Sequence, residues 1–139
     1  MKNVFSNTRI FFSIFVIATV VLFSSCAKKI AFQSSSVVPA ARGTTTVKKD
    51  KNNNYNINMK LEYLAEPSRL DPPKSVYVVW VLTDNNVTQN IGQIKTSNNL
   101  NVTFETVTSF KPIKIYITAE DDASVRNPGM TLILTTDNF

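Results

Sequence analysis

The sequence contains no histidine, one cysteine and three glycines among its 139 residues. Histidine is the usual general base near neutral pH and the commonest transition-metal ligand. Its absence excludes nucleophile–histidine catalysis and histidine-ligated zinc. The single cysteine, Cys26, cannot form a disulfide within the chain. We therefore predict that the protein is not an enzyme, with no catalytic residues, no metal site and no cofactor.

The formal net charge of +5 is unevenly distributed along the chain. Residues 26–54 carry +5 by themselves, whereas from residue 55 onward seven basic residues face nine acidic ones, a net charge of −2. A basic segment outside the main body suits contact with an anionic membrane surface. Nucleic-acid binding needs a basic face on the folded domain, so we predict no nucleic-acid partner.

The N-terminus has the proportions of a secretory signal peptide. Lys2 and Arg9 precede the apolar run 10–23, IFFSIFVIATVVLF. This run is shorter than the ~20 residues that span a bilayer as a helix, but it matches a signal-peptide core. Small residues follow it, directly before Cys26. We predict that residues 1–25 are a signal peptide.

The segment 22–26, LFSSC, resembles the lipobox of bacterial lipoproteins, although Phe23 stands where that family usually has leucine. The resemblance implies that Cys26 is lipidated by diacylglycerol and acylated on its new amine after cleavage. Several acyl chains anchor stably, at ~0.8 kcal/mol per buried CH₂. Because no aspartate follows Cys26, the resemblance favours the outer membrane of a Gram-negative bacterium. An uncleaved helix, or an ordinary signal peptide leaving a free thiol, remains the alternative.

Residues 26–42 are rich in small polar residues, which predicts a flexible tether after the lipidated cysteine. The domain is then expected to span residues 43–139, starting with a strand over Gly43–Lys49 and a turn over 50–54. Lys48, Lys49 and Lys51 form a basic cluster at this turn. They are interpreted either as a solvated hairpin tip or as a site of attraction to lipid headgroups.

The domain is rich in period-two alternation, the pattern of a strand with one buried face. Ile57, Met59, Leu61 and Tyr63 alternate with polar residues, and a further alternating strand places Ile113, Ile115, Ile117 and Ala119 on its inner face. Shorter strands are expected over residues 90–96, 100–105 and 129–135. Several short strands separated by turns, without helical periodicity, predict an all-β, antiparallel, immunoglobulin-like β-sandwich of about seven strands.

The run 75–82, SVYVVWVL, is apolar on both faces and is expected to be an interior strand covered on both sides. Trp80 is interpreted as a core anchor on the face that it shares with Val76, Val78 and Leu82.

The stretch 77–120 resembles the extracytoplasmic domain of the anti-sigma-K-factor family. The matching motifs are Tyr77-Val78-Val79-Trp80, Ile91-Gly92 and Thr118-Ala119-Glu120, followed by Pro128-Gly129. Those regulators carry a cytoplasmic sigma-binding region and a spanning helix before this domain, whereas this chain has a lipoprotein-like signal and a tether. The resemblance therefore implies the domain's fold and not transcriptional regulation. The whole chain also resembles small Bacteroidota-type lipoproteins.

Two groups of residues are candidate sites. The acidic run 120–122 could offer oxygen ligands to Ca²⁺ or carboxylates for hydrolysis; a solvated loop is the default interpretation. The second group is a patch expected on the outer side of the central sheet: Tyr77, Val79, Val81, Tyr116 and Ile133. Exposed apolar area of this kind usually marks a partner surface. Alternatively, the segment 37–49 or a crossing loop covers the patch.

We predict a non-enzymatic, membrane-tethered binding module of the cell envelope with a protein partner. The alternative is a structural or accessory envelope lipoprotein with no specific ligand, and a hydrolase ranks last.

Overall fold

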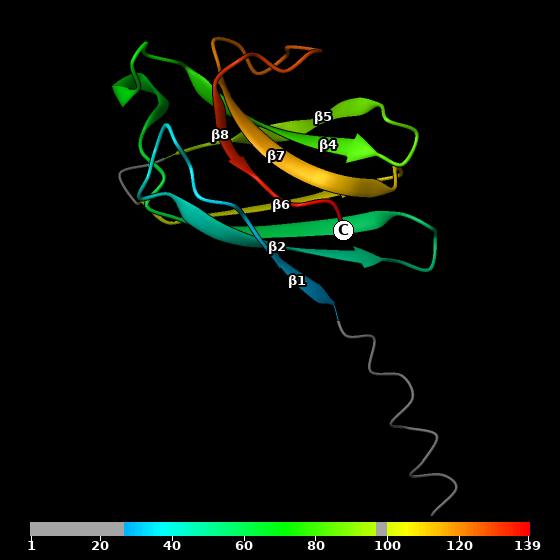
Figure 1. Cartoon of the computed structure of the whole chain (residues 1–139). Helices are drawn as coiled ribbons and strands as arrows, with labels where there is room; N and C mark the ends of the chain where they lie inside the picture. The colour runs from blue at the N-terminus through cyan, green and yellow to red at the C-terminus, as the bar shows by residue number, and fades with distance from the viewer. Residues whose placement is uncertain (1–26, 97–99) are drawn as a thin grey trace, which may run out of the picture.

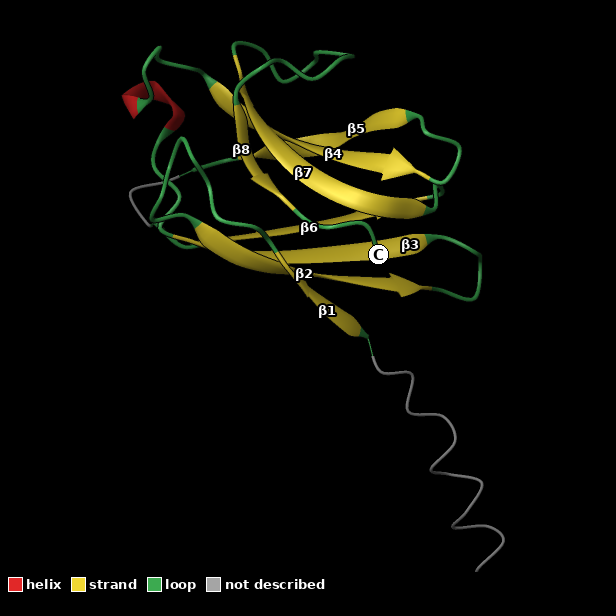
Figure 2. Ribbon diagram, in the orientation of Figure 1, coloured by secondary structure: helices red, strands yellow, loops and turns green. Residues whose placement is uncertain are grey.

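A computed structural model describes residues 27–96 and 100–139, which form two antiparallel four-stranded sheets packed face to face (Figure 1 and Figure 2). One sheet has the strand order β1-β2-β3-β6 and the other β5-β4-β7-β8. The strands are β1 Lys28–Ala31, β2 Arg42–Lys49, β3 Tyr55–Glu62, β4 Val76–Thr83, β5 Thr88–Ile94, β6 Val102–Thr108, β7 Pro112–Glu120 and β8 Leu132–Thr135. The predicted antiparallel sandwich is confirmed, with eight strands rather than about seven.

The order of the strands follows the immunoglobulin-like pattern. β3 pairs with β6 in one sheet and β4 pairs with β7 in the other, as strands B and E, and C and F, do in that architecture. Strands β2 to β8 thus take the places of A, B, C, C′, E, F and G, with β5 beside β4 at the edge. Strand β1 is an addition that pairs with β2.

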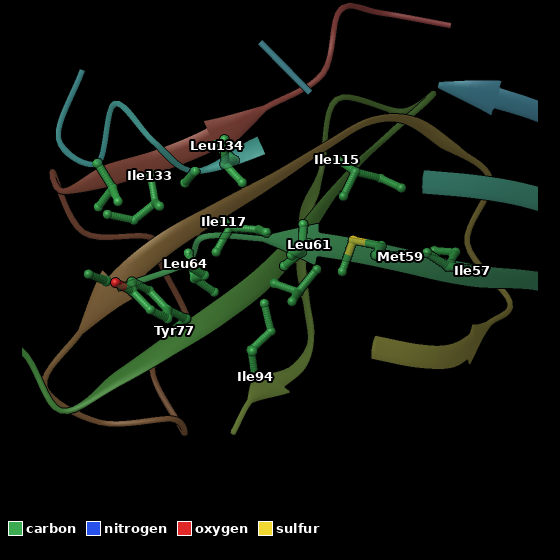
Figure 3. Close-up of a cluster of buried hydrophobic side chains, with 14 of the residues drawn as sticks. Ile57, Met59, Leu61, Leu64, Tyr77, Ile94, Ile115, Ile117, Ile133 and Leu134 are labelled. Carbon is green, nitrogen blue, oxygen red and sulfur yellow. The ribbon is translucent and has the colours of Figure 1, made fainter. Parts of the chain in front are cut away.

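The core lies between the two sheets and is built mainly from alternate residues of β3, β4 and β7, with Ile133 and Leu134 from β8 (Figure 3). Ile57, Met59 and Leu61 of β3 are buried there, facing Ile115 and Ile117 of β7. The predicted inner faces of these two strands are therefore confirmed at these positions. Each such aliphatic side chain contributes about 1.5–3 kcal/mol by leaving water.

Strand β4 faces the core with the opposite set of side chains from the one predicted. Tyr77, Val79 and Val81 belong to the core cluster, whereas Val78 and Trp80 are buried on the far face of the sheet. There the indole Nε1 of Trp80 donates to Thr118 Oγ1 at 2.8 Å, and its ring stacks on Tyr116 with centroids 6.4 Å apart. The expectation that β4 is covered on both faces is confirmed, but Trp80 does not anchor the core between the sheets.

The connection from β7 to β8 covers this far face. Asn90 lies opposite Trp80 in the pairing of β5 with β4, and its amide donates to the carbonyl oxygens of Ala123 and Val125, each at 3.0 Å. The connection must therefore pass over β4. Near the other end of the connection, Glu120 accepts a hydrogen bond from the backbone N–H of Gly129 at 2.7 Å. This hydrogen bond holds the connection where it leads into β8.

The prediction of a flexible tether over residues 26–42 is wrong for most of its length. Lys28–Ala31 form β1, and Phe32 forms an isolated bridge with Thr136. Val38 and Ala41 are buried in the core. Residues 28–42 therefore belong to the folded body, which was predicted to begin at residue 43. The polar composition of residues 28–31 did not exclude a strand. The backbone N–H and C=O groups of β1 are hydrogen-bonded by pairing with β2, while its lysine side chains stay in water.

Candidate functional site

The apolar patch predicted as a partner surface does not lie on the surface. Tyr77, Val79, Val81 and Ile133 are at most 1% exposed and belong to the core between the sheets (Figure 3). Tyr116 lies on the other face of its sheet, half-buried against Trp80. The predicted grouping is therefore wrong. The opposite sheet covers the four core side chains, and not the segment 37–49 or a crossing loop alone. Val38 and Ala41, from the segment before β2, belong to the same cluster.

The acidic run 120–122 is divided among three separate partners. Glu120 is buried and accepts the hydroxyl of Thr118 at 2.5 Å, while Asp121 pairs with Lys74 at 3.0 Å. Asp122 accepts the backbone N–H and the hydroxyl of Ser124, and these hydrogen bonds lower its pKa. Within the described part of the chain, no group of three histidine, cysteine, aspartate or glutamate side chains could hold a metal ion.

A different surface, at the end of the sandwich where β2 begins and β3 ends, has the features of a binding site. Tyr63 directly follows β3 and is 46% exposed. Its φ of 56° is left-handed, so the strand alternation stops at Glu62 and the predicted burial of Tyr63 is wrong. A bulky residue rarely adopts this conformation. Such conformations cost about 1–3 kcal/mol and cluster at functional sites.

Arg42 fixes the position of the Tyr63 ring. Its guanidinium carbon lies 4.9 Å from the ring centroid, and its Nε donates to Glu62 Oε2 at 2.8 Å. The hydrogen bond to Glu62, followed by the charge of that carboxylate, raises the pKa of Arg42. A cation over an exposed aromatic ring contributes about 0.5–1 kcal/mol. The three side chains therefore form one group of aromatic and oppositely charged contacts on the surface.

Two adjoining hollows meet at Tyr63 and Ala40, and together we call them the Tyr63 groove. One hollow, of ≈ 500 Å³, is lined by Phe32, Gln33, Ser34, Pro39, Ala40, Ala41, Arg42 and Tyr63. The other, of ≈ 400 Å³, is lined by Val38, Ala40, Tyr63, Ala65, Glu66, Arg69 and Leu100. Both are open to solvent, as suits a protein segment lying across the surface.

Hydrogen bonds from the core hold the loop beneath the groove. The phenol of Tyr77 donates to the carbonyl oxygen of Ala65 at 2.8 Å, and burial raises the pKa of Tyr77 to about 12. On the other side of Tyr63, Ser35 Oγ accepts the backbone N–H of Val38 at 2.9 Å. Leu64, between Tyr63 and Ala65, is buried in the core. The groove is therefore built on loops that are fixed from within.

The lining of the Tyr63 groove combines tyrosine and arginine with apolar surface. The charges of Arg42 and Arg69 are neutralised by Glu62 and Glu66, which lie 2.8 Å and 3.5 Å from them. The groove therefore carries no net charge that would favour a ligand of one sign. Tyrosine and arginine are enriched among residues that dominate protein–protein binding energy. Sequence reasoning missed this site because Tyr63 continues an apolar alternation, and its backbone angle alone turns it outward.

Cys26, the predicted lipidation site, lies outside the described residues. Within residues 27–96 and 100–139, no helix has the length and apolar character to cross a bilayer. Comparison with protein-family models, curated proteins and solved structures found no match to this chain. The resemblances to lipoproteins and to anti-sigma-K-factor domains therefore stay predictions.

Proposed function

We propose that this chain is a non-enzymatic lipoprotein of the cell envelope, anchored in a Gram-negative outer membrane through lipidated Cys26. Its β-sandwich binds a protein partner in the Tyr63 groove. The short apolar run 10–23 and the position of the sole cysteine support the anchor. The observation that carries the binding role is Tyr63 itself, exposed in a strained backbone conformation and held beneath the guanidinium of Arg42.

The direction of β2 supports this proposal, because the groove lies at the end of the strand away from Lys28. Lys28 pairs with Val47 near the end of β2, whereas Arg42 starts that strand. The eight residues of β2 extend roughly 25 Å at ~3.3 Å each. A chain anchored at Cys26 therefore holds the groove on the side of the domain that faces a partner rather than the membrane.

The test combines crosslinking in intact cells with matched tyrosine variants. A photo-reactive amino acid at position 40, at the junction of the two hollows, should yield a discrete crosslinked product that is identified by mass spectrometry. Tyr63→Ala and Arg42→Ala should each weaken binding of that partner by about 30-fold, the effect of losing about 2 kcal/mol at a dominant interface residue.

Tyr55→Ala is the matched control, because Tyr55 opens the strand that Tyr63 follows and lies 5.9 Å from a lysine ammonium, that of Lys49. Binding that survives Tyr63→Ala and Arg42→Ala, or that falls equally in Tyr55→Ala, would contradict a role for the groove. Mass spectrometry of the mature N-terminus tests the anchor separately, since the proposal requires an acylated Cys26.

A further inference from the structure

Three turns gather at the end of the sandwich opposite the Tyr63 groove, seen at the right of Figure 1. They are the β2–β3 turn at 50–54, the β4–β5 turn at 84–87 and the β6–β7 turn at 109–111. The pairing of Tyr55 with Thr108 brings the first and third together. The backbone N–H of Asp84 donates to the carbonyl oxygen of Lys111 at 3.2 Å and joins the second to the third. We call this surface the proximal end.

The proximal end exposes large apolar side chains. Phe110 and Val87 are each 47% exposed on the two turns that the Asp84–Lys111 hydrogen bond joins. Val107 is 58% exposed near the end of β6. The turns that carry them are fixed: Thr83 Oγ1 accepts the backbone N–H of Val87 at 3.1 Å, and Thr108 Oγ1 accepts that of Phe110 at 3.2 Å. These apolar tips are therefore presented to solvent by ordered turns.

The same end is basic. Its exposed lysines are Lys28, Lys48, Lys49, Lys51 and Lys111, and the acidic residues of the three turns are Asp50 and Asp84, so these residues carry a net charge of +3. Lys111 is paired with Asp84 at 3.6 Å. Asp50 is engaged in its own turn, where it accepts the backbone N–H groups of Asn52 and Asn54. Lys48, Lys49 and Lys51 form no ion pair with any described residue. Apolar tips that share one end of the sandwich with these three lysines match the chemistry of an anionic lipid surface.

The path of the chain favours this occupant. Strand β1 begins at Lys28, opposite Val47 and beside the β2–β3 turn, and Cys26 stands two residues earlier. An anchor at Cys26 therefore brings the proximal end within a few ångströms of the headgroups, because two extended residues reach at most ~7 Å. We propose that the proximal end docks on an anionic bilayer, with Phe110 and Val87 in the interface and Lys48, Lys49 and Lys51 among the headgroups.

This inference rests on the lipid anchor of the proposed function, and it goes further by fixing the orientation of the domain. A domain held by its lipid anchor alone samples many orientations on the membrane. Docking selects one, with the Tyr63 groove pointing away from the lipid. Each lysine near an anionic surface favours binding by about fivefold, which corresponds to about 1 kcal/mol.

The experiment uses the full chain, purified from the membranes of a Gram-negative host and reconstituted in vesicles of phosphatidylcholine and phosphatidylglycerol in about equal amounts. Phe110→Cys receives an environment-sensitive fluorophore, and Ser68→Cys at the opposite end is the matched control. Lipids with a spin label in the acyl chain should quench the label at position 110 and not that at position 68. The parent chain should take up no label, since an acylated Cys26 has no thiol.

The triple variant K48E/K49E/K51E tests the charge contribution. It should lower the ratio of docked to undocked domain by on the order of 100-fold and abolish quenching at position 110, while the chain still floats with the vesicles. The variant K60E/K95E/R126E changes charge equally elsewhere on the surface and should retain quenching. Val87→Cys provides a second reporter if the emission of Trp80 shows that Phe110→Cys does not fold.

Flotation without quenching at positions 110 and 87 would overturn the docking and leave the anchor intact. Quenching that survives K48E/K49E/K51E would also overturn it, because the lysines would then not hold the domain. A chain that does not float at all would refute both the anchor and the docking.

Discussion

Replacing Thr118 with valine tests how the far face of β4 and β7 is held together. The Thr118 hydroxyl accepts the Nε1–H of Trp80 at 2.8 Å and donates to Glu120 Oε1 at 2.5 Å. Glu120 in turn accepts the backbone N–H of Gly129, which begins the return into β8. All of the three side chains in this series are buried. One hydroxyl therefore links the only tryptophan to the connection that covers it.

The magnitude follows from what valine leaves behind. The indole N–H would be buried without an acceptor, which costs about 1–3 kcal/mol, and the carboxylate would lose a hydrogen bond worth about 1.5–3 kcal/mol. Since the two losses share one network, they do not add fully. We expect Thr118→Val to lower the free energy of unfolding by about 3 kcal/mol and the Tm by roughly 10–15 °C.

Thr45→Val is the matched control. Thr45 is as buried as Thr118, at 1% against 2% exposure, but its Oγ1 has no hydrogen-bond partner among the described residues. The same substitution there removes a hydroxyl that is buried without compensation, so it should leave the protein equally or more stable, by up to ~1 kcal/mol.

The assay is urea unfolding of the full chain in nonionic detergent, followed by tryptophan fluorescence. Trp80 is the sole tryptophan and is fully buried, so its emission reports the unfolding of this face directly. Equal destabilisation by the two variants, or a larger loss from Thr45→Val, would refute the reasoning, because size and shape change identically in both.

Three further outcomes are expected from the structure. Burial raises the pKa of Tyr77 to about 12, so as pH rises through 10 the unfolded chain releases this proton before the folded chain does. The contribution of the neutral phenol to the free energy of unfolding is fully present below pH 10. It should fall between pH 10 and 12 by at most ~1.4 kcal/mol per pH unit. Tyr77→Phe should remove this part of the pH dependence of urea unfolding, and an unchanged slope would contradict it. Gly43→Ala should destabilise the fold, since the new Cβ would lie 2.6 Å from Leu61 Cδ2. A Tm equal to that of the parent would contradict this expectation, because β2 and β3 would then accommodate the methyl group without loss of stability. Met59→Ala should cost about 2–5 kcal/mol in urea unfolding through the cavity that it leaves, whereas fully exposed Met130→Ala should cost nothing measurable, and similar losses in the two would count against the assigned core.

The alternation in β3 and β7 was enough to predict their buried faces. Along each strand one set of side chains is apolar and the other polar, so the hydrophobic effect permits one orientation. The same reasoning failed for β4, where both sets are apolar. Its orientation was decided by partners far along the chain: Thr118 supplies an acceptor for the indole of Trp80, and the β7–β8 connection covers that face.

Local sequence also failed at β1 and at Tyr63. Lys28–Ala31 has too few apolar residues to predict a strand, and it forms one because β2 offers an unpaired edge. Tyr63 continues the apolar alternation of β3, but its left-handed backbone turns it out toward Arg42, twenty-one residues earlier in the sequence. Neither the register of β2 against β3 nor this backbone angle can be read from neighbouring residues.

The sequence by itself determined that the chain is an antiparallel sandwich of short strands, because period-two patterning and the turns between strands are local properties of the chain. It also located the basic residues and the sole cysteine near the N-terminus. The tertiary structure decided which face of β4 is the core, where Tyr63 meets Arg42, and that the lysines share one end with Phe110. These features depend on strand register and on contacts between distant segments, and those are fixed when the two sheets pack together.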